Sequence, residues 1–244
     1  MPPRPPIRAS LPSRLAIPAS KRTFLTSLLS AAASSASSSL PAQTLSATRR
    51  LPYNHKALYT VIADIDSYSS FLPYCSVSRV TSWTPSPDPE FKRRWPTRAD
   101  LTAGWSGFEQ TYTSRVLCIP GSIVEALSGK GVRSGIPAEI LAKYGLKDDG
   151  NFSSSPATHK GTVDEEGVFK MLVTRWTVTP AVSVEGATPN TAVPQGQDWS
   201  DVHLNIRFQF ANPVYVAASL AVVDKIAPVM IEAFVDRANK VLGP

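Results

Sequence analysis

The stretch Asp201–Phe210, DVHLNIRFQF, decides the fold of this chain of 244 residues. Successive side chains of a β-strand point to opposite faces of the sheet, so residues two apart share a face. One face here carries Val202, Leu204, Ile206, Phe208 and Phe210, and the other carries Asp201, His203, Asn205, Arg207 and Gln209. A strand with one apolar and one wet face is typical of an antiparallel sheet that covers a core on one side.

A long amphipathic helix is predicted after this strand, over about residues 213–242. Its apolar face holds Leu220, Val223, Ala227, Met230, Phe234 and Val241, and is widened by Val222, Ile226, Val229 and Ala233. A face this wide is expected to be buried against the sheet. Pro228 lies inside the helix and predicts a kink, because proline removes an i→i−4 hydrogen bond and clashes with the previous turn.

The chain before this strand adds one helix and further strands. Asn54 can cap a helix, and the apolar residues that follow recur at helical spacing up to a predicted end at Leu72, before Pro73. Extended runs are expected at about 45–51, 75–83, 98–105, 108–119, 122–127 and 168–178. We therefore predict an α+β helix-grip fold, in which a curved antiparallel sheet wraps around the long C-terminal helix and leaves an apolar cavity.

The chain is expected to fold as one domain over residues 44–243, behind a leader of residues 1–43. Three polar or proline-rich stretches do not fit the pattern of a core, at about 84–97, 128–167 and 185–200. Connections longer than about 15 residues are uncommon in compact domains. These stretches are therefore predicted to be surface insertions, with a short helix near 137–146 in the second.

The net charge of +6 comes almost entirely from the leader. No Asp or Glu precedes Asp64, and the first 31 residues hold Arg4, Arg8, Arg14, Lys21 and Arg22. Without these five, 20 basic residues stand against 19 acidic ones. A nearly neutral body lacks the basic surface that phosphate backbones require, so nucleic acid is not an expected partner.

The leader is rich in Arg and Ser and free of acidic residues, which is the composition of a mitochondrial transit peptide. As a helix, residues 20–33 place Lys21 and Arg22 beside an apolar face that includes Phe24 and Leu28. A basic amphipathic helix suits an anionic membrane surface or a receptor groove. A secretory signal peptide and a tail without an address are the alternatives, although Ser and Thr interrupt the apolar stretch that the first requires.

Several short strings together resemble the mitochondrial coenzyme Q-binding proteins of the START / polyketide-cyclase-like superfamily. They are Arg49–Leu51 (RRL), Asp66–Cys75 (DSYSSFLPYC), Tyr112–Val116 (YTSRV), Trp176 and Phe208–Phe210 (FQF). The resemblance covers about residues 44–243 and leaves the three insertions unmatched. It implies a lipid chaperone without catalytic residues, which binds ubiquinone or a related prenyl lipid and supports quinone delivery to the respiratory chain and quinone biosynthesis.

The same resemblance implies a location on the matrix side of the mitochondrial inner membrane. It implies peripheral contact with the membrane surface and proteins of quinone biosynthesis or respiration as candidate partners. Ubiquinone would be a bound ligand, and no cofactor or metal is expected. An apolar tail requires a long apolar cavity with few polar groups at its head end.

The residues expected to contact the ligand come from the mouth, the sheet and the closing helix. Phe71, Leu72 and Pro73 are expected to gate the cavity, because apolar residues beside a helix-ending loop often stay exposed. The full set is Phe71, Leu72, Pro73, Trp105, Phe108, Leu204, Ile206, Phe208, Phe210, Val223, Ile226, Met230 and Phe234. Each of these residues also fits a packed core, and Trp176 is assigned to the core.

A cyclase- or aromatase-like enzyme that acts on a hydrophobic aromatic substrate is the alternative function. Its acid–base candidates are Glu109, Glu125, His203 and Asp224. A solvated charge is the simpler interpretation of all four. No His–acid pair is apparent, and Cys75 and Cys118 have no evident base to activate a thiolate. A ligand-free adaptor protein is the third possibility.

Overall fold

The computed structural model describes residues 41–105, 108–148, 169–181, 198–213, 216 and 223–243. Residues 1–40 of the predicted leader lie outside the described residues, and Gln43 at its end already belongs to the first strand. The second half of the second insertion and most of the third also lie outside them. The elements are β1 (Gln43–Leu51), α2 (His55–Ala63), the 3-10 helix η1 (Ile65–Ser70), β2 (Cys75–Trp83), β3 (Pro96–Trp105), β4 (Phe108–Ile119), β5 (Ile123–Ser128), α3 (Ala138–Lys143), β6 (Phe169–Pro180), β7 (Ser200–Phe210) and α5 (Val223–Leu242).

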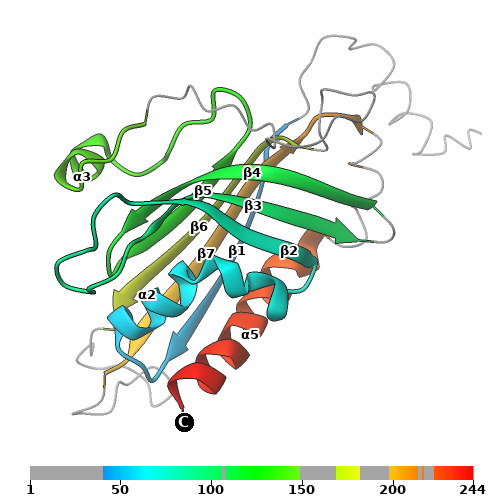
Figure 1. The fold of residues 1–244 in the computed structure, drawn as a ribbon. Coiled ribbons are helices and arrows are strands. Elements are labelled where there is room, and N and C mark those ends of the chain that lie inside the picture. The colour runs from blue at the N-terminus through cyan, green and yellow to red at the C-terminus, as the bar shows by residue number, and fades with distance from the viewer. Residues whose placement is uncertain are drawn as a thin grey trace, which may run out of the picture. The chain divides into compact units, whose positions relative to one another are not determined.

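The strands form one seven-stranded sheet in the order β1-β7-β6-β5-β4-β3-β2. Every neighbouring pair is antiparallel. Figure 1 shows the sheet curving around α5, which packs on β1 and β7, while α2 packs on β5 and β6. The predicted α+β helix-grip fold is therefore confirmed.

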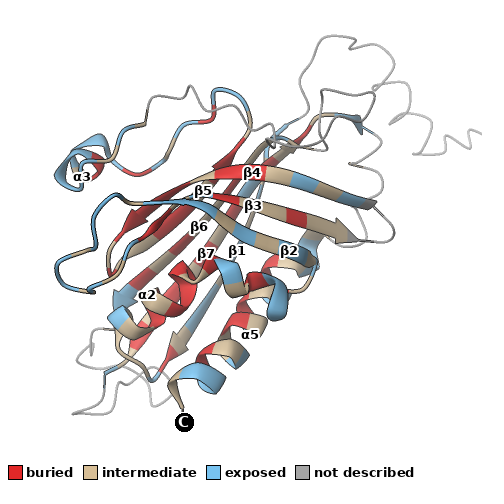
Figure 2. Cartoon of the chain, viewed as in Figure 1, coloured by how far each residue is buried: buried red, intermediate tan, exposed pale blue. Residues whose placement is uncertain are grey.

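The alternating strand forms as its pattern predicts. β7 pairs with β1 on one side and β6 on the other, so Leu204 lies opposite Ala47 and Trp176. Its five apolar side chains are each at most 5% exposed, whereas Arg207 on the other face is exposed. Figure 2 shows that buried residues are concentrated in the central strands of the sheet and in α2, with further ones along α5.

The closing helix α5 buries Ala227, Ile231, Phe234 and Ala238 against this face. Pro228 lies inside α5, and its side chain is exposed; as a proline it lacks the N–H of one i→i−4 hydrogen bond. Within the described residues, no helix is long and apolar enough to cross a membrane.

The prediction of a single helix that continues to Leu72 is wrong, because the structure has two shorter helices there. α2 begins as predicted, because the side-chain oxygen of Asn54 accepts from the N–H of Lys56 at 2.8 Å, but it ends at Ala63. Asp64 leaves the helical region with ψ at 63°, and η1 continues in a new direction. The Tyr68 hydroxyl donates back to the Ile62 carbonyl at 2.5 Å, which secures the turn and directs Tyr68 into the core.

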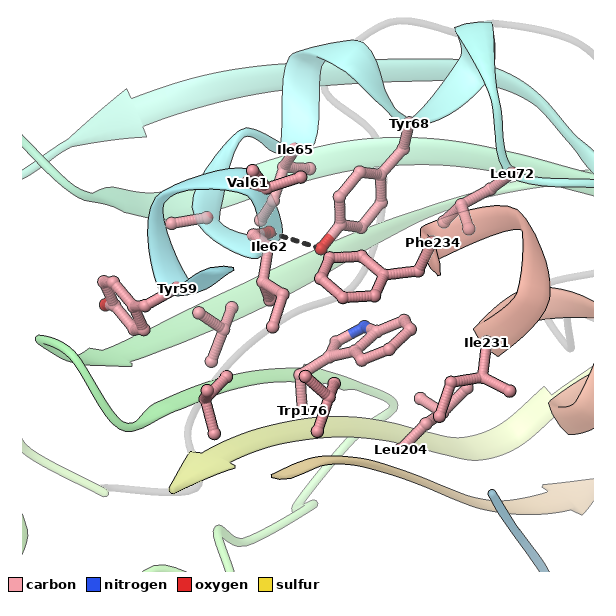
Figure 3. Close-up of a cluster of buried hydrophobic side chains, with 14 of the residues drawn as sticks. Tyr59, Val61, Ile62, Ile65, Tyr68, Leu72, Trp176, Leu204, Ile231 and Phe234 are labelled. Carbon is pink, nitrogen blue, oxygen red and sulfur yellow. Dashed lines mark hydrogen bonds between the residues drawn. The ribbon is translucent and has the colours of Figure 1, made fainter. Parts of the chain in front are cut away.

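The main core lies between the sheet, α2, η1 and α5. Figure 3 shows Ile62, Trp176, Leu204 and Phe234 converging there from four different elements. The rings of Trp176 and Phe234 lie 5.1 Å apart between centroids. Burial of such aromatic side chains is a large part of the energy that holds the helices on the sheet.

The stretch 84–97 is more than the surface insertion that was predicted. Its Trp95 is 3% exposed and meets the ring of Tyr59 edge-on at 4.9 Å, with Phe91 beside both. The carboxylate of Asp88 accepts from the backbone N–H groups of Glu90 and Phe91, which fixes the loop that carries these rings. The sequence analysis missed this contribution to the core because the prolines in the stretch interrupt any helix or strand pattern.

The second insertion covers the outer face of the sheet. Its described part, residues 129–148, includes α3 and adds apolar side chains to a second cluster. That cluster consists of Leu117, Ile119, Leu127, Val132, Ile136, Leu141 and Val173. The outer face of β4, β5 and β6 is therefore apolar and covered, unlike the wet outer face of β7.

Glu125 is the charged residue that holds this segment to the sheet. It lies on the outer face of β5 with no exposure, so its predicted role as a solvated charge is wrong. One carboxylate oxygen accepts from the guanidinium of Arg175 on β6, with an Nε–Oε1 distance of 2.8 Å, and the other accepts from the Ser134 hydroxyl. Asp148 accepts the N–H of Ser134 and pairs with Arg115 at 2.5 Å.

Replacing Glu125→Gln should lower the free energy of unfolding by about 2–3 kcal/mol, because it leaves the guanidinium of Arg175 partly buried without its counter-charge. The measurement is urea unfolding followed by circular dichroism. Glu232→Gln is the matched control, since it removes the exposed pair with Arg49, and it should cost less than about 1 kcal/mol. Equal losses in the two variants would contradict a structural role for Glu125.

Candidate functional site

An apolar cavity of about 150 Å³ lies between the sheet and the helices. All seven strands contribute to its wall, together with η1, the loop that follows it, and the N-terminal half of α5. A cavity of about this volume, with an apolar lining, accommodates a ligand of the size of a benzene ring. The cavity therefore fits one ring or a short piece of an aliphatic chain.

The cavity has a closed end and an open end. At the closed end, Trp176, Val124 and Ile65 are each 3% exposed. At the other end, Pro73 and Tyr74 lie in the loop before β2, and Tyr74 is 40% exposed. A ligand that enters from solvent must therefore pass the loop of residues 71–75.

Small side chains on the sheet create the void. Ser114, Ala126 and Thr174 face the interior from β4, β5 and β6, and Ala103 and Gly104 lie near the open end of β3. At the closed end, Phe234 fills the corresponding space by packing on Trp176. Interiors are otherwise close-packed, so a void forms where small residues face a helix that does not approach further.

Most of the predicted ligand-contacting residues surround this cavity. Those in its wall are Leu72, Pro73, Ile206, Phe208, Phe210, Val223, Ile226 and Met230. They come from the mouth loop, β7 and α5, which the sequence pattern had placed on facing surfaces. Their contact with a ligand remains a prediction.

Three predicted residues lie elsewhere, and two lie outside the described side chains. Phe71 lies outside the cavity wall, packed beside Tyr68 with the guanidinium of Arg237 over its ring at 5.5 Å. Leu204 and Phe234 belong to the packed core at the closed end, outside the cavity wall, which favours a packing role. The side chains of Trp105 and Phe108, at the ends of β3 and β4, are not among those described.

Sequence reasoning missed the residues that β3 to β6 and η1 add to the wall. They include Tyr68, Leu101, Tyr112, Val124, Leu172 and Trp176. The period-two pattern of residues 108–119 already places Tyr112 and Ser114 on one face. Which face is inner is decided by the pairing of β4 with β3 and β5, so the strand alone carried no such signal.

Three ionisable side chains in the wall, Tyr68, Tyr112 and Cys75, are held in their neutral forms near pH 7. Burial raises the pKa of the Tyr68 and Tyr112 phenols above their ordinary value. Burial also raises the pKa of the Cys75 thiol to about 11. A neutral, apolar wall disfavours a charged ligand, because an ion would lose its hydration without gaining a partner.

A second hollow lies on the outer side of the mouth. It is a groove of about 430 Å³ between the end of η1 and α5. Leu72 and Pro73 belong to both walls, so they separate the groove from the cavity. Val229 and Ala233 form the apolar part of the far side, and Glu232 and Asp236 its charged rim.

Residues 51–135 and 156–235 match the family described as polyketide cyclase / dehydrase and lipid transport. The chain belongs to this family. The matched residues contain the mouth loop, β2 to β7 and the N-terminal half of α5, which together form most of the cavity wall. The cavity is thus a feature of the part of the chain that defines membership.

Within this family, the chain is similar to a mitochondrial coenzyme Q-binding protein of Schizosaccharomyces pombe, with 27% identity over 79% of this chain and 85% of that protein. It is also similar to the ribosome association toxin RatA of Pseudomonas aeruginosa, with 23% identity over 79% of this chain and 93% of that one. The resemblance to the coenzyme Q-binding proteins that the sequence strings indicated is confirmed.

A solved structure shares the fold. The Zhui aromatase/cyclase of Streptomyces superposes with a TM-score of 0.50 at 10% identity, over 83% of this chain and 96% of that one. Identity this low carries information on the fold alone.

The acid–base candidates of a cyclase-like enzyme lie away from the cavity. Glu109 and Asp224 are exposed. His203 lies on the outer face of β7, where its Nδ1 is 2.8 Å from the Thr48 hydroxyl, and Glu125 is on the outer face of β5. Among the described residues, no three His, Cys, Asp or Glu are grouped to hold a metal ion.

Alkylation of Cys75 should report on the cavity. With its pKa near 11, the thiolate fraction at pH 8 is about a hundredfold below that of an ordinary thiol, and the fraction increases as the pH rises toward 11. We expect iodoacetamide to label a Cys118→Ser variant about a hundredfold more slowly when native than in urea, measured by mass spectrometry at pH 8. Equal rates would show that Cys75 is solvated and outside the wall.

Proposed function

We propose that this protein binds ubiquinone in its apolar cavity and acts as a non-catalytic lipid chaperone, which supports delivery of the quinone to the respiratory chain and its biosynthesis. The observation that most supports this function is a neutral, apolar cavity whose described wall contains none of the four acid–base candidates. Similarity to a coenzyme Q-binding protein supports the choice of ligand class.

The dimensions of the cavity suit part of a prenyl quinone. A void of about 150 Å³ holds the ring and leaves no space for a long polyprenyl tail. The tail would continue past Leu72 and Pro73 into the outer groove, which those two residues share. Ligand entry and exit would then require these residues to move, which makes them the gate of the cavity.

The backbone of the mouth loop supports a gating role. Tyr74 has φ at 65°, in the left-handed region that bulky residues rarely adopt. The N–H of Gly104 donates to the Tyr74 carbonyl at 3.0 Å and holds this conformation. Strained residues persist at ligand clamps because the surrounding structure determines them, and they ease the change to a second conformation.

Peripheral binding to the inner membrane, on the matrix side, completes the proposal. The exposed side chains of Tyr74 and Val77 lie at and just after the mouth loop, and Val229 lies on the outer groove. Apolar residues at the edge of a cavity allow a lipid to leave a bilayer without crossing water. Partner proteins of quinone biosynthesis or respiration belong to the same proposal.

Filling the cavity should abolish ligand binding without unfolding the protein. Ala126→Phe adds a ring from β5 into the void, where it displaces little packed material. Quinone co-purified from a respiring host, measured by mass spectrometry of a lipid extract, should fall at least tenfold relative to wild type. Thermal melting of the same preparation should change by no more than a few degrees.

The matched control for this experiment is Ala142→Phe, which adds the same ring to the exposed surface of α3, away from the cavity. It should retain the full lipid content of the wild-type protein. If Ala126→Phe also retains its lipid, the ligand does not occupy the cavity. If the wild-type extract contains no prenyl lipid, the proposed ligand is wrong.

The proposed location predicts import of a reporter protein. Residues 1–46 fused to a fluorescent protein should direct it to mitochondria, because the leader is basic, rich in Ser and free of acidic residues. Changing Lys21 and Arg22 to glutamate should abolish import, since it removes the basic edge of the amphipathic segment. The measurement is co-localisation with a mitochondrial dye, and secretion of the reporter would support a signal peptide instead.

A further inference from the structure

Trp176 carries a hydrogen-bond donor for which the described part of the chain supplies no acceptor. Its side chain lies in the cavity wall and is 3% exposed, and its indole Nε1 has no hydrogen-bond partner among the described residues. Figure 3 shows this nitrogen on the ring edge that faces Tyr68 and Phe234. Buried indole N–H groups usually find a partner, so an unpaired one in a ligand cavity indicates a missing acceptor.

The hydroxyl groups of Tyr68 and Ser114 in the cavity wall already donate their protons to other acceptors. The Tyr68 hydroxyl donates to the Ile62 carbonyl at 2.5 Å. Ser128 donates to the Thr113 carbonyl at 3.1 Å, so the 2.7 Å contact between Ser114 and Ser128 must use the proton of Ser114. Tyr68 and Ser114 therefore present only lone pairs to the cavity, while Trp176 presents only a donor.

The ring of Phe234 does not satisfy this donor. It lies 5.1 Å from the Trp176 ring at an interplanar angle of 44°, which permits at most a weak contact between the N–H and the aromatic face. A hydrogen bond to oxygen would be considerably stronger, and an oxygen atom carried by the ligand could approach from the cavity.

We infer that the cavity selects ligands whose ring end carries a carbonyl oxygen, and that the Nε1–H of Trp176 donates to this oxygen at the closed end. The inference rests on the proposed function, because it assigns the orientation of the ligand in the same cavity. The ring enters first and lies near Trp176, and the apolar tail leaves between Leu72 and Met230 toward the mouth. Carbonyl-free hydrocarbons of the same shape bind with lower affinity.

This orientation follows from the difference in solvent exposure between the two ends of the cavity, since the wall is buried near Trp176 and exposed near Tyr74. An oxygen atom of the ligand at the open end would be hydrogen-bonded to water both before and after binding, so its placement there would add little affinity. At the closed end, the oxygen satisfies a donor that is otherwise desolvated and unpaired, and the cost of that unpaired donor disappears when the ligand binds. The tail needs no polar partner and suits the apolar end at the mouth.

The experiment compares two probes on the full-length protein. Decylubiquinone carries ring carbonyls, and decylbenzene has the same tail on a plain ring. We expect Trp176→Phe to weaken decylubiquinone binding about tenfold, the scale of one buried hydrogen bond, and decylbenzene binding less than twofold. Both dissociation constants are measured by equilibrium dialysis with mass-spectrometric quantification.

Trp95→Phe is the matched control. Trp95 is also 3% exposed with an unpaired indole N–H, but it lies in the aromatic group with Tyr59 and Phe91, outside the cavity wall. This variant should bind both probes as the wild type does. It therefore separates loss of the donor in the cavity from the general cost of shortening a buried tryptophan.

A nuclear magnetic resonance measurement on wild-type protein serves if Trp176→Phe does not fold. The indole N–H signal of Trp176 should move downfield when decylubiquinone is added and stay in place with decylbenzene, and the Trp95 signal should not respond to either. An unmoved Trp176 signal, or equal weakening of both probes in Trp176→Phe, would overturn the inference. Equal wild-type affinities for the probes would overturn it while leaving apolar-ligand binding intact, and binding of neither would remove the proposed function as well.

Discussion

The apolar inner face of the curved sheet has to be covered, and the rest of the structure depends on how this is done. β7 presents a continuous row of apolar side chains, and antiparallel pairing with β1 and β6 extends that face sideways. Exposing such a surface to water would cost far more than the domain's net stability. α5 covers β1 and β7, and α2 covers β5 and β6, so the two helices meet over the centre of the sheet.

The cover is complete at one end and incomplete at the other. Large rings close the space where α2 and α5 meet, as the packing of Phe234 on Trp176 illustrates. Towards the mouth, the sheet presents small side chains such as Ala126 and Thr174, and η1 and its loop replace the regular helix. The tightly packed end of the core thus holds the helices on the sheet, and the cavity extends from this end toward the mouth.

The outer face of the sheet is also covered over part of its area, but by a different set of contacts. Over β4 to β6 it is covered by residues 129–148, which bring an apolar cluster and the ion pair of Glu125 with Arg175. Charge is thus buried on the outer side of the sheet, while the described cavity wall on the inner side contains no carboxylate, Lys, Arg or His side chain. An ion placed on the inner side would lose its hydration without gaining a charged partner.

Much of the fold follows from local patterns in the sequence. The alternation in β7, the cap at Asn54 and the apolar face of α5 are properties of neighbouring residues, so they predicted the α+β helix-grip architecture and the contribution of β7 and α5 to the cavity. The break at Asp64 was not predicted, because it depends on the Tyr68 hydroxyl reaching back to the Ile62 carbonyl, a contact that helical periodicity does not encode.

The sequence predicted only part of the cavity wall. Ile206, Phe208 and Met230 were expected in the wall because each lies on the buried face of a strongly patterned element. Trp176, assigned to the core, also borders the void, and Leu204, expected to contact ligand, lies outside the cavity wall. Both outcomes depend on how closely the helices approach each part of the sheet.

By itself, the sequence determined which face of each well-patterned element is buried, because side-chain direction repeats with the period of the backbone. Only the tertiary structure decided where burial leaves a space, and which charges are buried with a partner. Glu125 and Arg175 are 50 residues apart in the chain and meet through the pairing of β5 with β6. Such register depends on long-range pairing and packing, which no window of neighbouring residues contains.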